Sequence, residues 1–138
     1  MSNAKKKGDA REKQVQKILE GQGRLVLPAQ RTMKPIYTPK GVRYISQAND
    51  FYGLFDGMYR QDNRAIVWYQ VKSDMSDVYK AKKAICEWMN NYANFTLEHA
   101  EVWMYVYRKG YRVWTYIPVK DEWLESFINF KGISIDTL

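Results

Sequence analysis

Four segments of the chain are rich in aromatic and β-branched residues, a composition that favours β-strands. They are residues 52–60, 64–73, 101–108 and 111–117. The first two flank the turn-forming triplet at residues 61–63, and the last two flank Lys109-Gly110. We therefore predict two β-hairpins, and any fold for this chain must place them in a sheet.

Apolar residues recur at helical spacing in three further segments. They predict amphipathic helices at residues 9–20, with Asp9 as N-cap, at residues 76–92 and at residues 119–130. Residues 24–27 have the composition of a short strand. Residues 28–49 contain three prolines and no clean period, so we expect a long loop, with a short strand at most at residues 42–46. The predicted order α-β-β-β-α-β-β-α is an α/β domain with a mixed central sheet flanked by helices.

The length of 138 residues suits one domain, so residues 1–138 are assigned to a single domain with residues 1–7 as a flexible leading segment. One cysteine, Cys86, and one histidine, His99, cannot complete a tetrahedral zinc site. No apolar run approaches the roughly 20 residues that span a bilayer. We expect a cytoplasmic protein without a membrane partner.

The formal net charge of +7, from 22 Lys and Arg against 15 Asp and Glu, favours an acidic partner. Nucleic acid is the commonest such partner for a small basic domain. Composition alone therefore points toward nucleic-acid binding without identifying a reaction.

Polar residues gather at the predicted hairpin of residues 52–73. Gln70 and Lys72 are two residues apart on one strand and point to the same face. A tight turn places Asp56 across from Gln70. Glu12 borders the buried stripe of the first predicted helix, so its carboxylate can face the sheet. Each residue alone also suits a structural role, but together they form a candidate site.

In this order along the chain, the four residues resemble the PD-(D/E)XK nuclease superfamily, particularly its small Holliday-junction-resolvase-like members. The resemblance covers about residues 8–90, roughly three fifths of the chain, through the Glu12 helix, the Asp56 strand and Gln70-Val71-Lys72 before a basic helix. It implies a restriction-endonuclease-like fold and a Mg²⁺- or Mn²⁺-dependent endonuclease that hydrolyses DNA, with branched or junction DNA among its candidate substrates.

The resemblance also implies roles for individual residues. Asp56, Gln70 and the Val71 carbonyl would bind the metal, Lys72 would act on the water or the scissile phosphate, and Glu12 would be the catalytic acid of the first helix. Gln70 stands where most members have Asp or Glu, although transposase-type endonucleases use Gln there. Oxygen ligands suit Mg²⁺, but neutral oxygens should bind it more weakly than carboxylates do.

Six basic residues are candidates for contacts with DNA phosphates. They are Lys7, Arg11, Arg31, Arg43, Lys80 and Lys83. Tyr37 and Tyr44 lie in the predicted long loop and are candidates for contacts with the nucleic acid as well. A solvated basic surface is the alternative interpretation of the same residues.

Several alternatives stay open. Asp50 competes with Asp56 as metal ligand, although the shorter spacing from Asp56 to Gln70 suits a tight hairpin. Asp74 and Asp77 fit a helix-capping role better than catalysis. The protein could bind DNA without cutting it, or be a basic protein-interaction module of phage or mobile-element type. Cutting a junction would need two active sites, which leaves a homodimer open.

Overall fold

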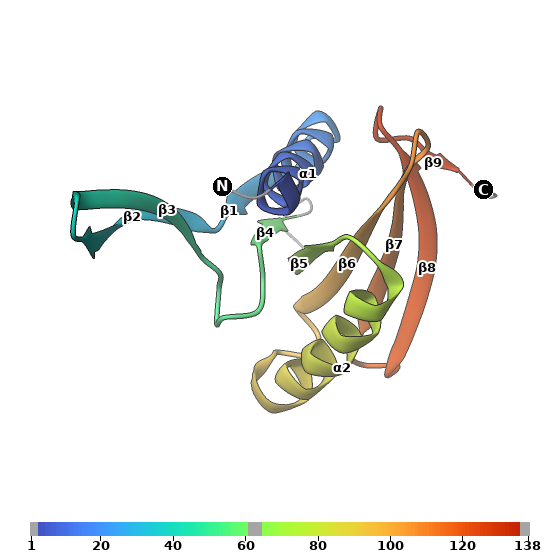
Figure 1. The fold of residues 1–138 in the computed structure, drawn as a ribbon. Coiled ribbons are helices and arrows are strands. Elements are labelled where there is room, and N and C mark those ends of the chain that lie inside the picture. The colour runs from blue at the N-terminus through green and yellow to red at the C-terminus, as the bar shows by residue number, and fades with distance from the viewer. Residues whose placement is uncertain (1–2, 61–64, 136–138) are drawn as a thin grey trace.

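A seven-stranded mixed sheet lies between two helices in the computed structural model, which describes residues 3–60 and 65–135 (Figure 1). The helices are α1 (Asn3–Gly21) and α2 (Met75–Tyr92). The strand order is β1 (Leu25–Pro28), β4 (Gly57–Arg60), β5 (Ile66–Lys72), β6 (Glu98–Val106), β7 (Gly110–Ile117), β8 (Glu122–Asn129) and β9 (Ser134–Ile135). Only the β5–β6 pair is parallel among these strands, and α2 connects the two. The general α/β class agrees with the sequence prediction.

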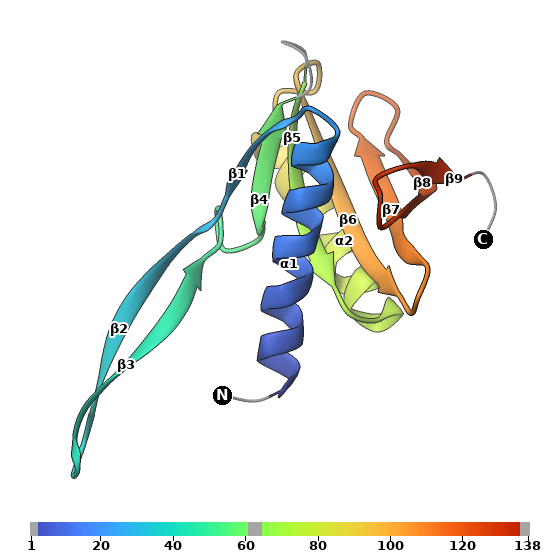
Figure 2. The same cartoon turned by 90° about the horizontal axis from the view of Figure 1, so that it is seen from above.

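The two helices pack on opposite faces of the sheet (Figure 2). The central strand β5 alternates between them, because successive strand residues point to opposite faces. Val67 and Tyr69 pack in the cluster with Val15 and Leu19 of α1. Trp68 instead packs in the cluster under α2. Burial on both faces explains why this strand has an almost continuous apolar sequence.

The start of α2 follows the end of β5 after two residues. Asp74 is the N-cap, and its side chain accepts a 2.9 Å hydrogen bond from the Asp77 N–H. The capping role predicted for these aspartates is therefore confirmed. The cap positions the helix directly beyond Lys72, the last residue of β5.

Residues 119–130 do not form the predicted helix, because most of this segment is strand β8. Trp123, Leu124 and Phe127 have a spacing that fits either structure. The decisive factor is the outer edge of β7, whose main-chain groups need hydrogen-bond partners. β8 pairs with that edge along its whole length, from Glu122 to Asn129.

Residues 28–49 also differ from the prediction, because they form a hairpin in place of a loop. Its strands β2 (Gln30–Thr38) and β3 (Gly41–Asn49) make a separate two-stranded sheet. Pro35 lies within β2. Proline has no main-chain N–H, and an edge strand tolerates this where the nitrogen faces outward, because no neighbouring strand needs a donor there. The hairpin projects away from the body of the domain (Figures 1 and 2).

The N-terminal prediction needs two corrections. α1 begins at Asn3 and not at residue 9, so residues 3–7 belong to the helix, while residues 1–2 lie outside the described residues. Asp9 lies inside this helix and is not its N-cap; it forms an ion pair with Arg31. The turn predicted at residues 61–63 lies outside the described residues. Neither of the two helices in the described ranges is long and apolar enough to cross a membrane.

Candidate functional site

Asp56 lies immediately before β4, where β4 and β5 separate. Its N–H donates a 2.9 Å hydrogen bond to the Tyr69 carbonyl, and its Oδ2 accepts a 2.6 Å hydrogen bond from the Val71 N–H. Asp56 therefore binds the residues on either side of Gln70. The predicted placement of Asp56 beside Gln70 agrees with this geometry.

Glu12 reaches Asp56 from α1, and the two carboxyl groups hydrogen-bond each other. Burial, together with the nearby negative charge of Asp56, raises the pKa of Glu12 to about 8. Burial also raises the pKa of Asp56 to about 6, against the opposing effect of the Val71 N–H. A buried carboxyl pair of this kind retains a proton near neutral pH.

Asp50 and Lys72 complete the charged cluster. Burial raises the pKa of Asp50, whereas the positive charges of Lys72 and Arg31 lower it. Lys72 also lowers the pKa of Asp56, so the ammonium group lies near both aspartates. Asp50 is exposed, whereas Asp56 is half-buried and bonded to Glu12. The cluster therefore contains three carboxyl groups and one lysine.

Gln70 is buried, with 7% of its surface exposed. Its Oε1 atom has no hydrogen-bond partner within the part of the chain that the structure describes. A buried acceptor without a partner is uncommon, because it loses its hydrogen bonds to water without replacement. This oxygen is consequently available for a ligand.

Carboxylate and amide oxygens are the donor types that a hard divalent cation such as Mg²⁺ binds. Among the described residues, no three His, Cys, Asp or Glu side chains form a group that could hold a metal ion. Amide and main-chain oxygens are further donors that a cation at this cluster could use. The Gln70 amide has an oxygen of the kind that Mg²⁺ and Mn²⁺ prefer, although Gln70 is not among the residues that line the pocket beside the carboxyl pair.

A pocket of about 200 Å³ opens beside the carboxyl pair. Glu12, Asp56 and Tyr69 line it, together with Asp9 and Arg31. Gly57 makes room for this arrangement, because a Cβ atom there would lie 2.3 Å from the Tyr69 hydroxyl. The Tyr69 ring can therefore pack beside the pocket only while residue 57 is glycine.

Two of the six predicted phosphate-binding residues adjoin this cluster. Arg11 donates a 3.1 Å hydrogen bond to Ser73 Oγ, next to Lys72, and its guanidinium stacks over the Tyr105 ring. Arg31 forms its 3.0 Å ion pair with Asp9 at the pocket.

The other four lie in three separate places. Lys7 lines a second pocket with Arg11. Arg43 lies on the projecting hairpin, and Lys80 and Lys83 are exposed on α2. The predicted basic surface is therefore not one continuous patch around the carboxyl pair.

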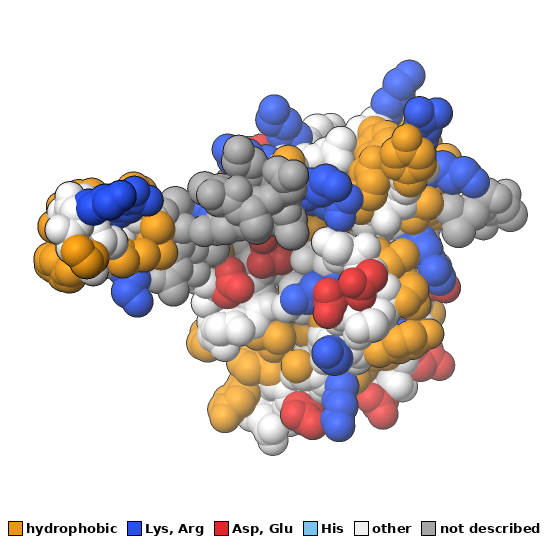
Figure 3. All heavy atoms as spheres, in the orientation of Figure 1, with side chains coloured by type: hydrophobic (Ala, Val, Ile, Leu, Met, Phe, Trp, Pro, Cys, Tyr) orange, Lys and Arg blue, Asp and Glu red, His pale blue; other side chains and the backbone are white. Residues whose placement is uncertain are grey.

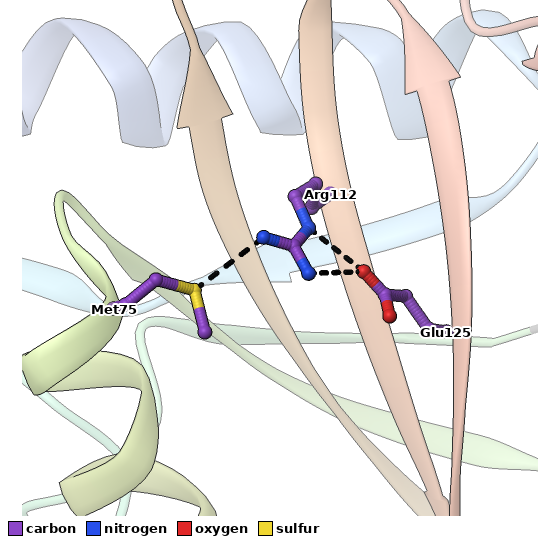
Figure 4. Close-up of polar contacts among 3 residues, drawn as sticks. All are labelled: Met75, Arg112 and Glu125. Atoms are coloured by element: carbon purple, nitrogen blue, oxygen red, sulfur yellow. Dashed lines mark hydrogen bonds and ion pairs between the residues drawn. The ribbon is translucent and has the colours of Figure 1, made fainter. Parts of the chain in front are cut away.

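Two features near the charged cluster were not predicted from the sequence: the position of Asp9 beside Glu12 and the contacts of Arg112. Asp9 is three residues before Glu12, a helical spacing that could have identified it as a neighbour. Arg112 on β7 donates a 2.7 Å hydrogen bond to Glu125 Oε1 and a 3.6 Å hydrogen bond to Met75 Sδ (Figure 4). It thus ties the start of α2 to β7 and β8, a connection that requires residues 119–130 to be a strand.

The cysteine and the histidine of the chain are not among the residues of this cluster. Cys86 is on α2, where its Sγ accepts a 3.3 Å hydrogen bond from Trp123 Nε1. His99 lies within β6, not before a strand as predicted, and burial lowers its pKa. Comparisons with protein-family models, with curated proteins and with solved structures gave no match to this chain.

Proposed function

We propose that the protein is a Mg²⁺- or Mn²⁺-dependent endonuclease with the restriction-endonuclease-like fold of the PD-(D/E)XK superfamily. Its substrate would be DNA, with branched or junction DNA as the leading candidate. The observation that carries the proposal is the buried Glu12–Asp56 carboxyl pair beside Lys72. The superfamily resemblance assigns these residue types to catalysis; Glu12 lies on α1, Lys72 ends β5 and Asp56 precedes β4.

The carboxyl pair needs a partner of opposite charge to ionise fully. Burial raises the pKa of both groups because the ionised forms lose hydration, and a neighbouring negative charge adds to it: Asp56 for Glu12, and Asp50 for Asp56. Asp56, Gln70 and the Val71 carbonyl would hold the divalent ion. When bound, the ion supplies polarisation of a phosphodiester and a lower pKa for a bound water.

The remaining roles belong to the side chains around this centre. Lys72 would orient the attacking water or neutralise the charge that develops on the scissile phosphate. Glu12, once deprotonated, would accept a proton from that water. Arg11 and Arg31 adjoin the cluster and would neutralise flanking phosphates.

A DNA-binding protein that does not cut is the second candidate. Gln70 supplies a neutral oxygen where a carboxylate would bind metal more strongly.

 A cation that binds the Gln70 amide oxygen in place of a carboxylate would therefore be held more weakly. Such a protein would shift DNA on a gel without cleaving it in any metal.

The test is incubation of the purified protein with supercoiled plasmid and with a four-way junction, in Mg²⁺, in Mn²⁺ and in EDTA. We expect cutting in the metals, none in EDTA, and none by the Asp56→Ala variant. Glu87→Ala removes an exposed carboxylate from α2 and is the matched control, which should cut like the wild type. Absence of cutting in both metals would overturn the endonuclease, and DNA binding alone would favour the second candidate.

A further inference from the structure

The hairpin of β2 and β3, residues 30–49, is called the arm. Its strands pair with each other over nine residue pairs and with no other described strand. At about 3.3 Å per residue, it is roughly 30 Å long. All residues of β2 except Thr38 are exposed. A two-stranded ribbon without a packing partner is marginally stable in water, so an arm of this length is expected to have one.

The arm has two chemically different faces, because residues alternate along each strand and paired residues share a face. One face is mainly apolar and carries Met33, Pro35, Tyr37, Val42 and Tyr44, with Arg31 at its base. The other face is mainly polar and carries Gln30, Thr32, Lys34, Arg43 and Asn49, with Ile36 and Ile45. Lys34 and Arg43 are diagonal neighbours on the polar face, since Lys34 pairs with Ile45.

The arm carries positive charge only. Residues 30–49 contain four basic residues and no Asp or Glu. Lys and Arg side chains stand beside hydrophobic ones on its visible side, at the left of Figure 3. Each copy of the chain has a net charge of +7, so association with a second copy would oppose like charges, whereas a polyanion offers the opposite charge.

Both ends of the arm meet the candidate site. Before β2, the Ala29 N–H donates a 2.8 Å hydrogen bond to the Asp56 carbonyl. After β3, the chain continues directly into Asp50, which interacts with Lys72. A polymer bound at the carboxyl pair would therefore have the arm beside it.

We propose that the polar face of the arm lies in the major groove of duplex DNA next to the candidate site. The major groove is about 12 Å wide and admits a two-stranded β-ribbon. One turn of the duplex measures about 34 Å, close to the length of the arm. Arg, Lys, Asn, Gln and Thr are side chains that hydrogen-bond base edges there. The inference rests on the proposed function for the choice of DNA as the polymer.

The test measures binding in EDTA by fluorescence anisotropy, so that no result depends on cutting. The probes are a 25-base-pair DNA duplex, an RNA duplex of the same sequence and single-stranded DNA. The polar-face variant is Lys34→Ala/Arg43→Ala. The matched control, Lys120→Ala/Lys131→Ala, removes the same charge from exposed positions near β8, at the opposite end of the strand order.

We expect the wild type to bind the DNA duplex more tightly than the RNA duplex, whose major groove is too narrow for the arm. The polar-face variant should lose affinity for the DNA duplex by roughly tenfold or more, and its salt slope should fall by about two. The control should lose clearly less affinity. Equal losses in the two variants, or equal binding of the DNA and RNA duplexes, would overturn the proposal.

Two further outcomes separate this proposal from its rivals. A stable dimer that the apolar-face variant Tyr37→Ser/Tyr44→Ser abolishes, with duplex affinity unchanged in the polar-face variant, would make the arm an interface between copies and overturn the proposal. Arm-dependent duplex binding without cutting in any metal would support the proposal while the endonuclease fails. If the protein cuts DNA in the metals but the polar-face variant keeps wild-type affinity for the duplex, the endonuclease is supported and the proposal for the arm is overturned.

Discussion

The Val71 N–H donates a 2.6 Å hydrogen bond to Oδ2 of Asp56. The bond lies where β4 and β5 separate, so a side-chain oxygen serves as acceptor for a main-chain N–H at the end of the strand pair. The same carboxyl group hydrogen-bonds Glu12 on α1. Asp56 thereby joins the sheet to the helix, and its structural and chemical roles can be separated by substitution.

Asp56→Asn keeps an oxygen that can accept the Val71 hydrogen bond but removes the charge. We expect the variant to fold with an unchanged or higher melting temperature at pH 8, because a buried charge is lost. Its metal-dependent cutting should fall roughly 100-fold or more. Plasmid nicking and thermal melting measure the two effects, with Glu87→Gln as control. Wild-type cutting by a folded Asp56→Asn protein would contradict the assignment of this carboxylate.

Lys72→Ala tests the role of the ammonium group near the two aspartates. We expect cutting to be lost while DNA affinity in EDTA stays nearly the same, because the lysine acts mainly on the transition state. Lys109→Ala, at an exposed turn between β6 and β7, removes one positive charge elsewhere and should cut normally. Cutting by Lys72→Ala at the wild-type rate would rule out the assignment.

The sequence predicted best the elements that combine a buried apolar stripe with a capping residue at their end. In α2, Val78, Ala81, Ile85 and Met89 are all buried, and Asp74 caps the helix. Their spacing and the cap are both visible in the sequence. The approach of Glu12 to Asp56 follows for a similar reason, because Glu12 lies one helical turn before the buried Val15 and Asp56 directly follows the buried Phe55.

The parts that the sequence missed depend on partners far along the chain or on no burial at all. Trp123 and Phe127 fit a helical spacing, and only the free edge of β7 decides in favour of a strand. The arm does not pair with the main sheet and β2 is exposed except at Thr38, so no contact with the core marks its strands in the sequence. The hydrogen bond from Arg112 to Glu125 could not be predicted either, because it requires β8 to pair with β7.

Gln70→Glu tests whether the unpartnered Oε1 atom is a metal ligand. We expect cutting to be kept or raised, because a carboxylate binds Mg²⁺ more tightly than an amide does. In EDTA the melting temperature should fall, since another buried carboxylate joins Asp56 and Glu12, and Mn²⁺ should restore it. Thermal melting with and without Mn²⁺ measures this. A folded variant that neither cuts nor responds to Mn²⁺ would show that the amide group itself is required.

Glu12→Gln tests the protonated carboxyl pair through the pH dependence of stability. The folded-state pKa of Glu12 is raised from 4.5 to about 8, so the folded protein binds this proton more tightly than the unfolded chain. The corresponding stability is fully present below about pH 4.5 and is lost as the pH rises through 8.

The variant lacks this titration, so its stability relative to the wild type should increase with pH across that interval. We expect a gain on the order of 1 kcal/mol at pH 8.5, after allowance for solvent screening of the partly exposed Glu12 side chain, or about 4 °C in melting temperature. Mg²⁺ should reduce the difference by stabilising the ionised wild-type pair. Urea unfolding at pH 5, 7 and 8.5 measures the effect, and Glu87→Gln is the control. A wild type that gains stability over Glu12→Gln as the pH rises would contradict the shared proton.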